Sequence, residues 1–373
     1  MAISKQQTIV HLTSVHRSYD TRIFQKECKS LAEAGYKVVL IVSGRDPSSL
    51  VSGIQTITVP KQKGRSRRFT VTMKDIFVHA LRAKGEAYHF HDPELIPLGV
   101  LLRILGKRVV YDVHETVPKQ ILSKEWIPKP LRFVLARIVG LAETIGATMF
   151  DGIVAATPGI ATAFPQHKTI IVQNFAKLAE FGNMNSLPYT QRGRLVAYIG
   201  GISRVRGVIE MIEAIGHLED ARLALGGEFD TEQLSLEVRK LHGWHAVDEL
   251  GWLSRNEVIE VLGISRAGLL TLHPEPNYLD SYPVKLFEYM LAGIPVIASN
   301  FPFWKQFVSD IGSGLMVDPL NPQEIADAID WLLEHPNEAE EMGRRGREAV
   351  LDRYTWESQG ERLIEFYDSI IFG

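Results

Sequence analysis

The sequence predicts an α/β fold of two domains, each built on a parallel sheet, and three observations support this prediction. Short apolar runs of strand length alternate with stretches of helical periodicity along most of the chain, a pattern typical of strand–helix–strand units. The alternation breaks once, at a polar and irregular stretch over 177–194. The chain has 373 residues, which is long for one hydrophobic core and suits two. We therefore expect two Rossmann-like domains whose sheets face one another across a cleft.

The expected elements of the first domain begin with a strand and an amphipathic helix over 20–34. Ile23, Phe24 and Leu31 recur at helical spacing, and Gly35 follows where the helix should end. The strands are expected at 8–13, 37–43, 54–59, 88–91, 108–113, 152–155 and 169–172.

The second domain is expected to start after the polar stretch and to repeat the alternation. Its strands are predicted at 195–199, 222–226, 246–249, 268–272, 294–298 and 314–317. Three helical stretches close the chain, and the last, over 355–371, is amphipathic.

The charge is divided unevenly between the two halves of the chain. The net charge at pH 7 is −3. Residues 1–180 hold 25 Lys and Arg against 14 Asp and Glu, a surplus of +11, whereas residues 181–373 hold 16 against 30, or −14. The basic residues gather in two groups: Lys61, Lys63, Arg65, Arg67, Arg68, Lys74, Arg82 and Lys84; then Lys119, Lys124, Lys129, Arg132 and Arg137.

Bulky apolar residues are interleaved with the second basic group: Ile121, Trp126, Ile127, Leu131 and Phe133. This mixture favours contact with an anionic membrane surface. A solvated basic face is the alternative. Nucleic-acid binding is disfavoured, because no nucleic-acid motif accompanies the charge.

The single cysteine, Cys28, excludes an internal disulfide and fits a reducing compartment. The N-terminus shows no signal peptide, and charged residues interrupt the apolar runs near 98–105 and 133–150. We therefore expect a cytoplasmic protein, peripheral to the inner face of the membrane if its basic face binds lipid.

The most informative stretch of the chain contains a short helix, expected over 284–292. It is apolar on almost every side, yet it carries Lys285 and Glu288, which share one face at i and i+3. Because buried charge is costly without a partner, this face either closes on itself or meets a polar ligand.

The loop before this helix adds an acid and two helix-start signals. Asp280 lies on the loop, Ser281 is expected to cap the helix, and Pro283 suits its first turn. Free N–H groups at a helix start bind anions. The combination indicates a site for a phosphorylated, hydroxyl-rich molecule.

These residues resemble the signature of retaining glycosyltransferases of family 4 (group 1), which have the GT-B fold. Asp280 and Glu288 stand at the two ends of the acid-x7-acid motif, and the helix, turn and strand that follow match in register through Tyr289, Met290, Gly293, Pro295, Val296 and Ile297. The first acid is usually Glu in that family, whereas here it is Asp280, shorter by one methylene.

The resemblance implies a division of labour between the domains. The N-terminal, acceptor-side domain would comprise 1–176 plus 357–373, because the last helix crosses back in GT-B enzymes. The C-terminal domain, 177–356, would bind the nucleotide sugar. Packing of the last helix within the second domain is the alternative.

The resemblance also implies which residues bind the donor. The family has a GRxxxxKG segment here, and Arg206 and Gly207 stand at its Lys-Gly. Gly201 stands where that segment has its Arg. Arg204 is expected to supply the positive charge of the missing Arg. The alternative is that both arginines are solvated turn residues. The implied donor-binding set is Gly200, Gly201, Arg204, Arg206, Gly227, Ser281, Tyr282, Pro283, Val284, Lys285 and Glu288. For Gly227, an ordinary turn is as consistent with the sequence.

Three residues are expected to take part in catalysis: His114, Asp280 and Arg206. Arg206 would stabilise the departing diphosphate, and Asp280 would hold hydroxyls of the donor sugar. His114 falls at the end of a predicted strand, where functional residues of open α/β sheets collect. A buried histidine bonded to the backbone is the alternative for His114.

The acceptor side is expected to include His16, His91 and Glu115. The first strand–helix turn lacks the Gly-Gly pair common in the family and offers polar residues such as His16 instead. For the segment beginning at His91, the alternative is that Asp92 caps a helix whose first residue is Pro93.

No cofactor and no metal ion are expected. His11, His16, His91 and His114 are not accompanied by an H-E-x-x-H motif or a cysteine cluster. The resemblance implies transfer of a sugar from a nucleotide diphosphate sugar, with UDP as the preferred base, to a glycan or lipid-linked acceptor in surface polysaccharide or glycoconjugate synthesis. A sugar-nucleotide 2-epimerase and a catalytically inactive nucleotide-sugar binding protein are the alternatives.

Overall fold

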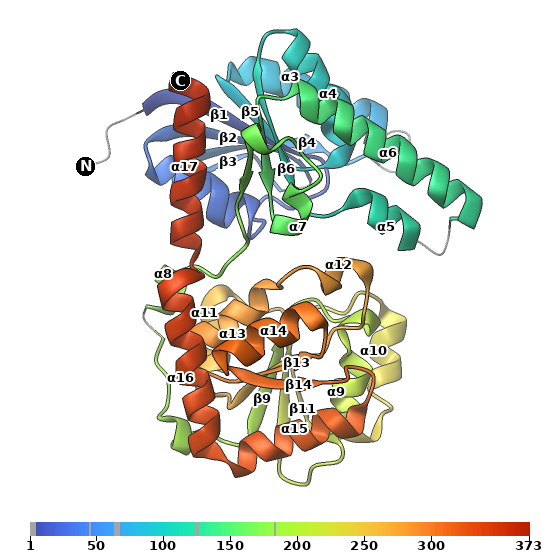
Figure 1. Cartoon of the computed structure of the whole chain (residues 1–373), viewed down its shortest axis with the longest axis vertical. Helices are drawn as coiled ribbons and strands as arrows, with labels where there is room; N and C mark the ends of the chain where they lie inside the picture. Colours follow the sequence, from blue (N-terminus) through green and yellow to red (C-terminus); the bar gives the residue numbers. More distant parts are fainter. Residues whose placement is uncertain (1–4, 45, 63–67, 124–126, 183) are drawn as a thin grey trace. The chain divides into compact units, whose positions relative to one another are not determined.

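The computed structural model describes residues 5–44, 46–62, 68–123, 127–182 and 184–373. It divides the chain into two compact units, Met1–Asn174 with Trp356–Gly373, and Phe175–Thr355. Each unit is an α/β domain with a largely parallel sheet and helices packed against it (Figure 1). The predicted fold class is therefore confirmed. The borders of the units lie one or two residues from those expected from the sequence.

The first unit contains an eight-stranded sheet in the order β3-β4-β2-β1-β5-β6-β7-β8. Its neighbouring strands are parallel except for β3 and β4, which form an antiparallel hairpin at the edge. The strands are β1 (Lys5–Thr13), β2 (Tyr36–Gly44), β3 (Ser49–Val51), β4 (Ile54–Pro60), β5 (Ala87–Phe90), β6 (Arg108–Val113), β7 (Gly152–Ala155) and β8 (Thr169–Ile171). The sequence did not predict β3, whose hairpin turns at Ser52 and Gly53 with positive φ at both residues.

Helices cover both faces of this sheet: α1 (Lys29–Glu33), α3 (Met73–Ala83), α4 (Ile96–Ile104), α5 (Val117–Ser123), α6 (Lys129–Met149), α7 (Pro158–Ala161) and α17 (Trp356–Phe372). Side chains alternate along each strand, so Val10 and Leu12 face one core while Ile9 faces the other. This second core also contains Trp356 and Tyr367 of α17. The predicted return of the last helix to the N-terminal domain is thus found.

The helix predicted over 20–34 is shorter than expected, and its first part has π-helical instead of α-helical hydrogen bonding. It consists of a π-helical segment, η1 (Ile23–Cys28), that continues into α1. The N–H of Glu27 donates to the carbonyl of Arg22, five residues earlier, instead of four. π-helical turns are rare in proteins, but those that occur often lie at functional sites. It places both Arg22 and Glu27 in the interior of the unit.

The second unit contains a six-stranded parallel sheet in the order β11-β10-β9-β12-β13-β14. The strands are β9 (Leu195–Ile199), β10 (Arg222–Gly226), β11 (Val247–Gly251), β12 (Ala267–Leu270), β13 (Val296–Ser299) and β14 (Gly314–Val317). Its helices are α8 (Leu178–Phe181), α9 (Val208–Ile215), α10 (Glu232–Val238), α11 (Arg255–Ile264), α12 (Pro276–Leu279), α13 (Val284–Leu291), α14 (Pro302–Ile311), α15 (Pro322–Glu334) and α16 (Pro336–Arg353).

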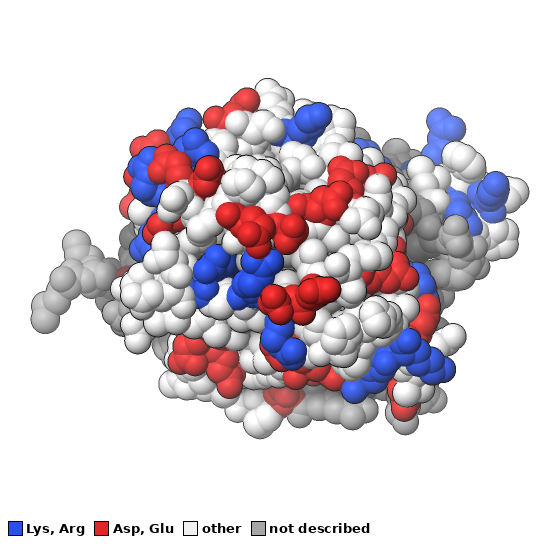
Figure 2. Space-filling model, turned by 90° about the horizontal axis from the view of Figure 1, so that it is seen from below, with Lys and Arg blue, Asp and Glu red and all other residues white. Residues whose placement is uncertain are grey.

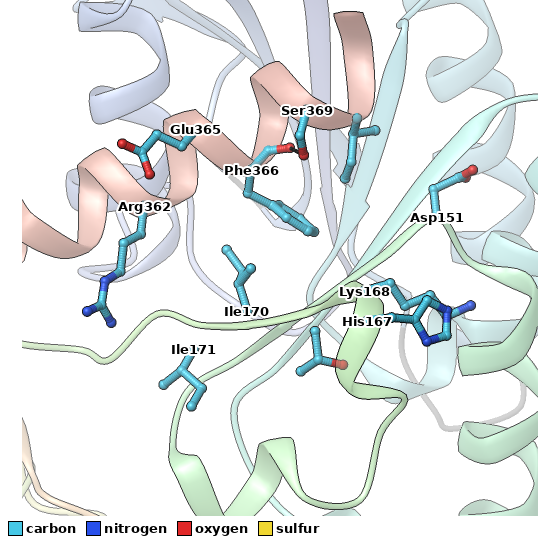
Figure 3. Close-up of a pocket in the computed structure, with 11 residues that line it drawn as sticks. Asp151, His167, Lys168, Ile170, Ile171, Arg362, Glu365, Phe366 and Ser369 are labelled. Carbon is cyan, nitrogen blue, oxygen red and sulfur yellow. Dashed lines mark hydrogen bonds between the residues drawn. The ribbon is translucent and has the colours of Figure 1, made fainter. Parts of the chain in front are cut away.

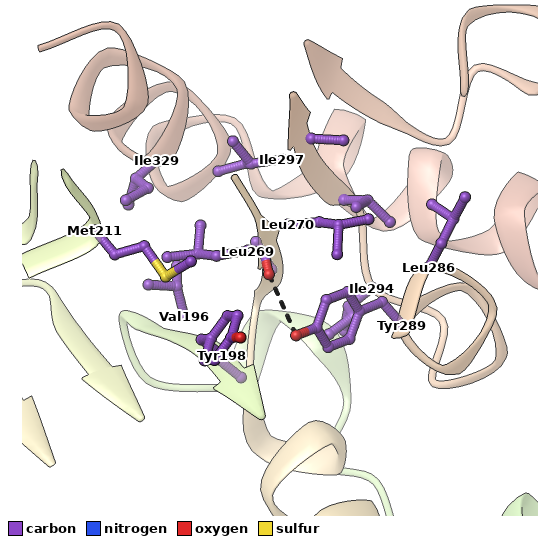
Figure 4. Packing of buried hydrophobic residues seen from close by; sticks show 14 of the residues in the cluster. Val196, Tyr198, Met211, Leu269, Leu270, Leu286, Tyr289, Ile294, Ile297 and Ile329 are labelled. Atoms are coloured by element: carbon purple, nitrogen blue, oxygen red, sulfur yellow. Dashed lines mark hydrogen bonds between the residues drawn. The ribbon is translucent and has the colours of Figure 1, made fainter. Parts of the chain in front are cut away.

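Helix α13 packs against the centre of this sheet through Tyr289. A Cβ added to Gly268 would lie 2.3 Å from the Tyr289 ring, so the ring occupies the space that a larger residue would fill. The Tyr289 hydroxyl donates to the Leu269 carbonyl at 3.3 Å (Figure 4). This packing fixes the face of α13 that carries Lys285 and Glu288.

The polar stretch over 177–194 is part of the second unit and is not a free linker. It contains α8, and its two aromatic side chains, Phe181 and Tyr189, are buried. The Tyr189 hydroxyl donates to the Arg266 carbonyl at 2.6 Å. The sequence did not predict this packing, because the segment is mostly polar and its two buried aromatic residues form no periodic apolar pattern.

Candidate functional site

The first part of the candidate site is the turn between β9 and α9. Gly200 and Gly207 both have positive φ, +139° and +76°, which favours glycine. A Cβ at Gly200 would lie 2.6 Å from the Lys285 ammonium nitrogen. The Gly200 N–H donates to the Gly226 carbonyl at 2.8 Å. Gly200 therefore contributes room for a cation rather than a hydrogen-bond donor for a ligand.

Lys285 brings a positive charge from α13 to this turn. Its ammonium lies 4.0 Å from the centre of the Tyr198 ring, a cation–π distance. Burial, together with the nearby charge of Arg206, lowers the pKa of Lys285 to about 7, and Glu288 opposes this shift. Lys285 therefore changes charge near neutral pH, and a bound anion would favour the charged form.

Arg206 lies beside Lys285 and is held by the same turn. Its Nη1 donates to the Gly201 carbonyl at 3.0 Å, and the Tyr198 hydroxyl donates to the same carbonyl at 2.8 Å. Burial opposes the charge of Arg206, but Tyr198 and Tyr278 raise its pKa. The structure thus brings together Lys285 and Arg206, two of the predicted donor-binding cations.

Arg204 does not join this pair. Its guanidinium donates to Glu237 of α10 at 2.6 Å, and its side chain is 56% exposed. In this structure Arg204 is an exposed turn residue, the alternative that the sequence left open for it. The expectation that Arg204 replaces the missing family cation is not supported by this geometry.

Gly227 closes on the same turn from β10. It has φ +141°, and an added Cβ would lie 1.9 Å from the Gly200 carbonyl oxygen. No side chain fits there, so Gly227 is required by a close backbone contact rather than by an ordinary solvent-facing turn.

Glu288 has a partner that the sequence analysis missed. Arg255, the first residue of α11, donates from Nη2 to Glu288 Oε1 at 2.7 Å and to Glu180 at 2.5 Å. The Glu288 side chain is only 12% exposed. Burial opposes the charge of Arg255, but Glu288 and Glu180 raise its pKa. The face carrying Glu288 is therefore partly closed by an ion pair.

The start of α13 differs from the predicted capping. Pro283, not Ser281, is the N-cap residue, and no side chain caps this helix. The Ser281 hydroxyl instead donates to the Asn277 carbonyl at 2.7 Å. Buried Trp304 fixes the loop, because its indole N–H donates to the Ser281 carbonyl at 2.7 Å. The predicted role of Ser281 as a cap is wrong, because its hydroxyl closes the preceding turn.

The remaining residues of the loop lie at the edge of this site. Tyr282 stacks on Phe303 with ring centres 4.3 Å apart. Val284 opens α13 and is half-buried. Asp280 is exposed at the end of α12. An exposed carboxylate there is accessible to a ligand without unfolding the loop.

In the first unit, His114 is almost enclosed. Its Nε2 lies 3.3 Å from Asp112 Oδ2, and its ring is parallel to that of His91 with centres 5.6 Å apart. Among the described residues neither ring nitrogen has a hydrogen bond, so the alternative of a histidine bonded to the backbone is not what is found. Burial lowers the pKa of His114 to about 3, although Asp112 opposes this shift. The ring is therefore neutral at physiological pH.

His91 does not reach the surface as expected for an acceptor contact. It is buried, and its ring nitrogens lie 2.9 Å from His11 Nδ1 and 2.9 Å from Asp112 Oδ2. His91 directly follows β5, and its burial disfavours direct contact with an acceptor, so its place on the acceptor side stays a prediction. Asp92 is the residue before a 3₁₀ turn that begins at Pro93, but its carboxylate accepts from Thr13 instead of capping the turn.

The other two acceptor-side candidates lie nearer the surface. His16 is 32% exposed, and its Nδ1 lies 3.2 Å from Asp20 Oδ2. Burial opposes protonation of His16, but the hydrogen bond to Asp20 and the charge of Asp92 raise its pKa. Glu115 is exposed.

The histidines gather in a way that the sequence did not predict. Within the described ranges, two groups of side chains offer ligand atoms within 4.8 Å of one another: His11, Glu27, His89 and His91; and His91, Asp112 and His114. His16, which the sequence analysis considered together with them, belongs to neither group.

Helix α6 presents an apolar stripe to solvent. Exposed large side chains follow Phe133 (64%) at intervals of three or four residues from the adjacent Val134 onward: Val134 (53%), Ile138 (58%), Leu141 (61%) and Ile145 (51%). Lys129 and Arg137 on the same helix are exposed. Of the predicted basic and apolar residues, Lys63, Arg65, Arg67, Lys124 and Trp126 lie outside the described residues. No described helix combines the length and apolar character needed to cross a bilayer.

The first unit also has a cavity of about 780 Å³ between β8 and α17 (Figure 3). Its lining includes Asp151, His167, Lys168, Arg362 and Phe366. Lys168 already donates to the carbonyls of Thr148 and Phe150 at 2.9 Å. None of the predicted site residues lines this cavity.

The acidic surplus of the second half does not create a continuous negative surface on the face that Figure 2 shows. Figure 2 shows a face on which basic and acidic side chains lie next to one another. Several such pairs are hydrogen-bonded, including Arg222 with Asp248 and Arg194 with Glu334. Paired surface charges of this kind contribute little to stability.

Comparison with known proteins identifies the second unit. Residues 182–349 match the family model described as glycosyl transferases group 1. The chain is 27% identical over 190 residues to an alpha-maltose-1-phosphate synthase of Mycolicibacterium smegmatis, covering 47% of this chain and 48% of that protein. It is 21% identical over 311 residues to an MMP alpha-(1->4)-mannosyltransferase of Mycolicibacterium hassiacum, covering 77% and 72%. The match thus spans about half the length of the first of these relatives.

Solved structures show the same arrangement of elements. The chain resembles a sucrose-phosphate synthase from Thermosynechococcus elongatus with a TM-score of 0.76 at 18% identity, covering 98% of this chain and 100% of that one. It resembles Anabaena Alr3699/HepE, solved in complex with UDP-glucose, with a TM-score of 0.73 at 14% identity, again covering 98% and 100%. The chain therefore has the GT-B fold, and its residues 182–349 match the model of group 1 glycosyl transferases.

Proposed function

We propose that the whole protein transfers a sugar from a nucleoside diphosphate sugar, with UDP as the base, to an acceptor hydroxyl with retention of configuration, as in family 4. The group 1 domain supports the transferase class. The UDP-glucose bound by the structurally similar Anabaena protein supports the choice of donor. The epimerase and the inactive binding protein are not favoured by these relatives.

The observation that carries the proposal is the pair of cations at the β9 turn. Lys285 and Arg206 flank Gly200 and Gly201, where the missing Cβ atoms leave space. A departing diphosphate develops negative charge, and preorganised cations stabilise that charge without reorganising. An anion there would also be near the N-terminus of α13, whose positive dipole end favours it.

The other residues of the loop and helix would recognise the rest of the donor. Glu288 would accept hydrogen bonds from ribose hydroxyls, with Arg255 orienting its carboxylate. Asp280 would hold hydroxyls of the donor sugar, and neutral His114 would exchange hydrogen bonds with the sugar or acceptor. The bond from the anomeric carbon to the diphosphate oxygen would break as the acceptor oxygen attaches from the same face, and the proton of the acceptor hydroxyl would pass to the departing diphosphate oxygen, so no protein nucleophile is required.

We propose that this transfer needs no metal ion on the diphosphate. Lys285 and Arg206, which lie at Gly200 and Gly201, would neutralise the charge of the leaving group in place of a divalent ion. Activity should therefore persist after treatment with a chelator.

The donor prediction is tested by thermal shift followed by turnover. UDP is expected to raise the melting temperature more than GDP, dTDP or CMP, because a ligand that binds only the folded state stabilises it by mass action. A panel of UDP-sugars would then be assayed with chelator present, and the anomeric configuration of the product read by NMR. A larger shift with GDP would reject UDP, and an inverted product would reject retention.

We further propose that the acceptor is a glycan or lipid-linked molecule at the cytoplasmic face of an anionic membrane. The apolar stripe of α6, with exposed Lys129 and Arg137 beside it, has the chemistry of an interfacial helix. The basic surplus of the first 180 residues is complementary to anionic lipid. Buried Cys28 is compatible with a reducing compartment. Such a place would suit synthesis of a surface polysaccharide or glycoconjugate.

Vesicle binding tests this contact. The protein should sediment with vesicles that contain phosphatidylglycerol at low salt and should be released as the salt concentration rises. The double variant Ile138→Ser/Leu141→Ser should lose most of this binding, whereas Leu351→Ser, which alters an equally exposed leucine of the second unit, should not. Equal binding by both variants would reject α6 as the contact. Dimerisation that disappears in the double variant would assign the stripe to a second copy instead.

A further inference from the structure

The histidine cluster of the first unit is buried between its sheet and η1. β1 and β5 are adjacent parallel strands, and their register places His11 opposite His89. His91 lies two residues beyond His89, where the strand alternation places it on the same face of the sheet. The π-helical segment η1 covers this face and contributes Glu27. All four residues are at most 2% exposed.

We propose that His11, His89, His91 and Glu27 bind a divalent transition metal ion, of which Zn²⁺ is the best match. One atom from each side chain lies within 4.8 Å of the others. Imidazole nitrogen and carboxylate oxygen are established zinc ligands, and four of them suit a closed structural site. Neighbouring ligands of tetrahedral zinc are roughly 3.3 Å apart, so these side chains would move slightly inward on binding.

The inner atoms of the cluster lack the partners that buried polar atoms normally have. In the described part of the chain, His11 Nε2, His89 Nε2 and both carboxylate oxygens of Glu27 have no hydrogen bond. Arg22 Nε lies 2.9 Å from Glu27 Oε1, as an ion pair without hydrogen-bond geometry. Unpaired buried polar atoms are costly, and a metal ion would satisfy several of them at once.

The outer atoms of two histidines are held as in metal sites. His91 Nδ1 lies 2.9 Å from Asp112 Oδ2, and His89 Nδ1 lies 2.8 Å from the Tyr367 hydroxyl. Metal-binding histidines almost always engage their second nitrogen in this way, which fixes the ring and directs the other nitrogen at the metal. His91 Nε2 is hydrogen-bonded to His11 Nδ1 at 2.9 Å, so His91 Nε2 would exchange this hydrogen bond for the metal ion.

The charges around the cluster also favour a cation. Glu27 and Asp112 both pair with the guanidinium of Arg22, so two carboxylates share one positive charge. A divalent ion would compensate the second carboxylate. The site is assigned a structural role, joining η1 to the sheet.

Metal analysis of the protein purified without a polyhistidine tag tests this assignment. We expect about one zinc per chain by mass spectrometry after dialysis against metal-free buffer. Removal with a strong chelator should lower the melting temperature, and added Zn²⁺ should restore it. Cobalt reconstitution should give the visible absorption of a tetrahedral site. Protein without metal, whose melting temperature Zn²⁺ does not change, would overturn the proposal.

Two variants locate the ion. Glu27→Gln keeps the size of the side chain and should reduce bound zinc to a small fraction of a chain equivalent. His242→Ala/His245→Ala removes an exposed histidine pair, with ring centres 5.2 Å apart, that could bind metal adventitiously. This second variant should keep its zinc. Loss of zinc from His242→Ala/His245→Ala would overturn the assignment, and the chelation experiment on the wild type decides the matter if Glu27→Gln fails to fold.

Discussion

Replacing Lys285 with methionine is expected to lower kcat/KM for sugar transfer about 100-fold to 1000-fold, the usual loss when one preorganised stabiliser of transition-state charge is removed. The ammonium lies beside Gly200 and over the Tyr198 ring, where methionine keeps most of the length of the side chain but not its charge. The measurement is steady-state turnover of a UDP-sugar. Lys305→Met, which alters an exposed lysine of α14, should leave turnover unchanged.

The pH dependence of binding gives Lys285→Met a second readout. The free protein holds the pKa of Lys285 at about 7, and a bound diphosphate would raise it, so binding takes up a proton above pH 7. The affinity for UDP should therefore fall as pH rises above 7, by up to about tenfold per pH unit. Calorimetry in two buffers of different ionisation enthalpy should detect the proton in the wild type and not in the variant. A pH-independent affinity in the wild type would contradict this role.

The melting temperature of Lys285→Met distinguishes a loss of function from a loss of folding. The pKa of Lys285 is lower in the folded protein than its ordinary value of 10.5, so the unfolded chain binds more protons between these two pH values. The contribution of Lys285 to stability is therefore complete above pH 10.5 and is lost as pH falls toward 7. Near pH 7 Lys285→Met should melt no lower than the wild type.

Replacing Glu288 with glutamine is expected to weaken UDP binding about 10-fold to 100-fold. A hydrogen bond to a charged group contributes roughly 1.5 to 3 kcal/mol, and a neutral amide would accept weaker bonds from the ribose. The variant keeps the shape of the side chain, so α13 should remain packed through Tyr289. Isothermal titration with UDP and with free pyrophosphate measures the effect. The affinity for UDP should fall, whereas the affinity for pyrophosphate, which has no ribose, should not.

The matched control for Glu288→Gln is Glu180→Gln. Glu180 is the other carboxylate bonded to Arg255, at 2.5 Å, and it lies in α8. If Glu288 acts through the ribose, Glu180→Gln should change UDP affinity little. Similar losses in the two variants would show that Glu288 matters only as a partner of Arg255.

The sequence predicted those parts of the fold and site that depend on neighbours along the chain. The alternation of strands and helices follows from local hydrophobic patterns, and it placed nearly every strand of the two sheets. Lys285 and Glu288 share a face because they are three residues apart on one helix. Their shared face therefore follows from the helical period alone.

The parts that the sequence could not predict depend on strand order and on side-chain geometry. His11 and His89 meet because β1 pairs with β5, which no local pattern encodes. Arg255 reaches Glu288 from a helix 33 residues earlier in the chain. The shift to π-helical bonding at η1 changes which residues face inward, and an ideal helical period cannot reveal it.

Ser281 illustrates a third limit. A serine before an apolar helix is a reasonable cap, but the same hydroxyl can close the preceding turn at lower cost. Here α12 ends one residue before Asp280, and the Asn277 carbonyl is within reach of the Ser281 hydroxyl. Two local uses of one hydroxyl compete, and the sequence does not rank them.

The contact between Gly227 and the Gly200 carbonyl has a mechanical consequence. Two turns from neighbouring strands touch backbone to backbone, with no flexible side chain between them to absorb a displacement. A ligand that shifts the first turn must therefore shift the second with it. A side chain introduced at Gly227 would therefore displace both turns together.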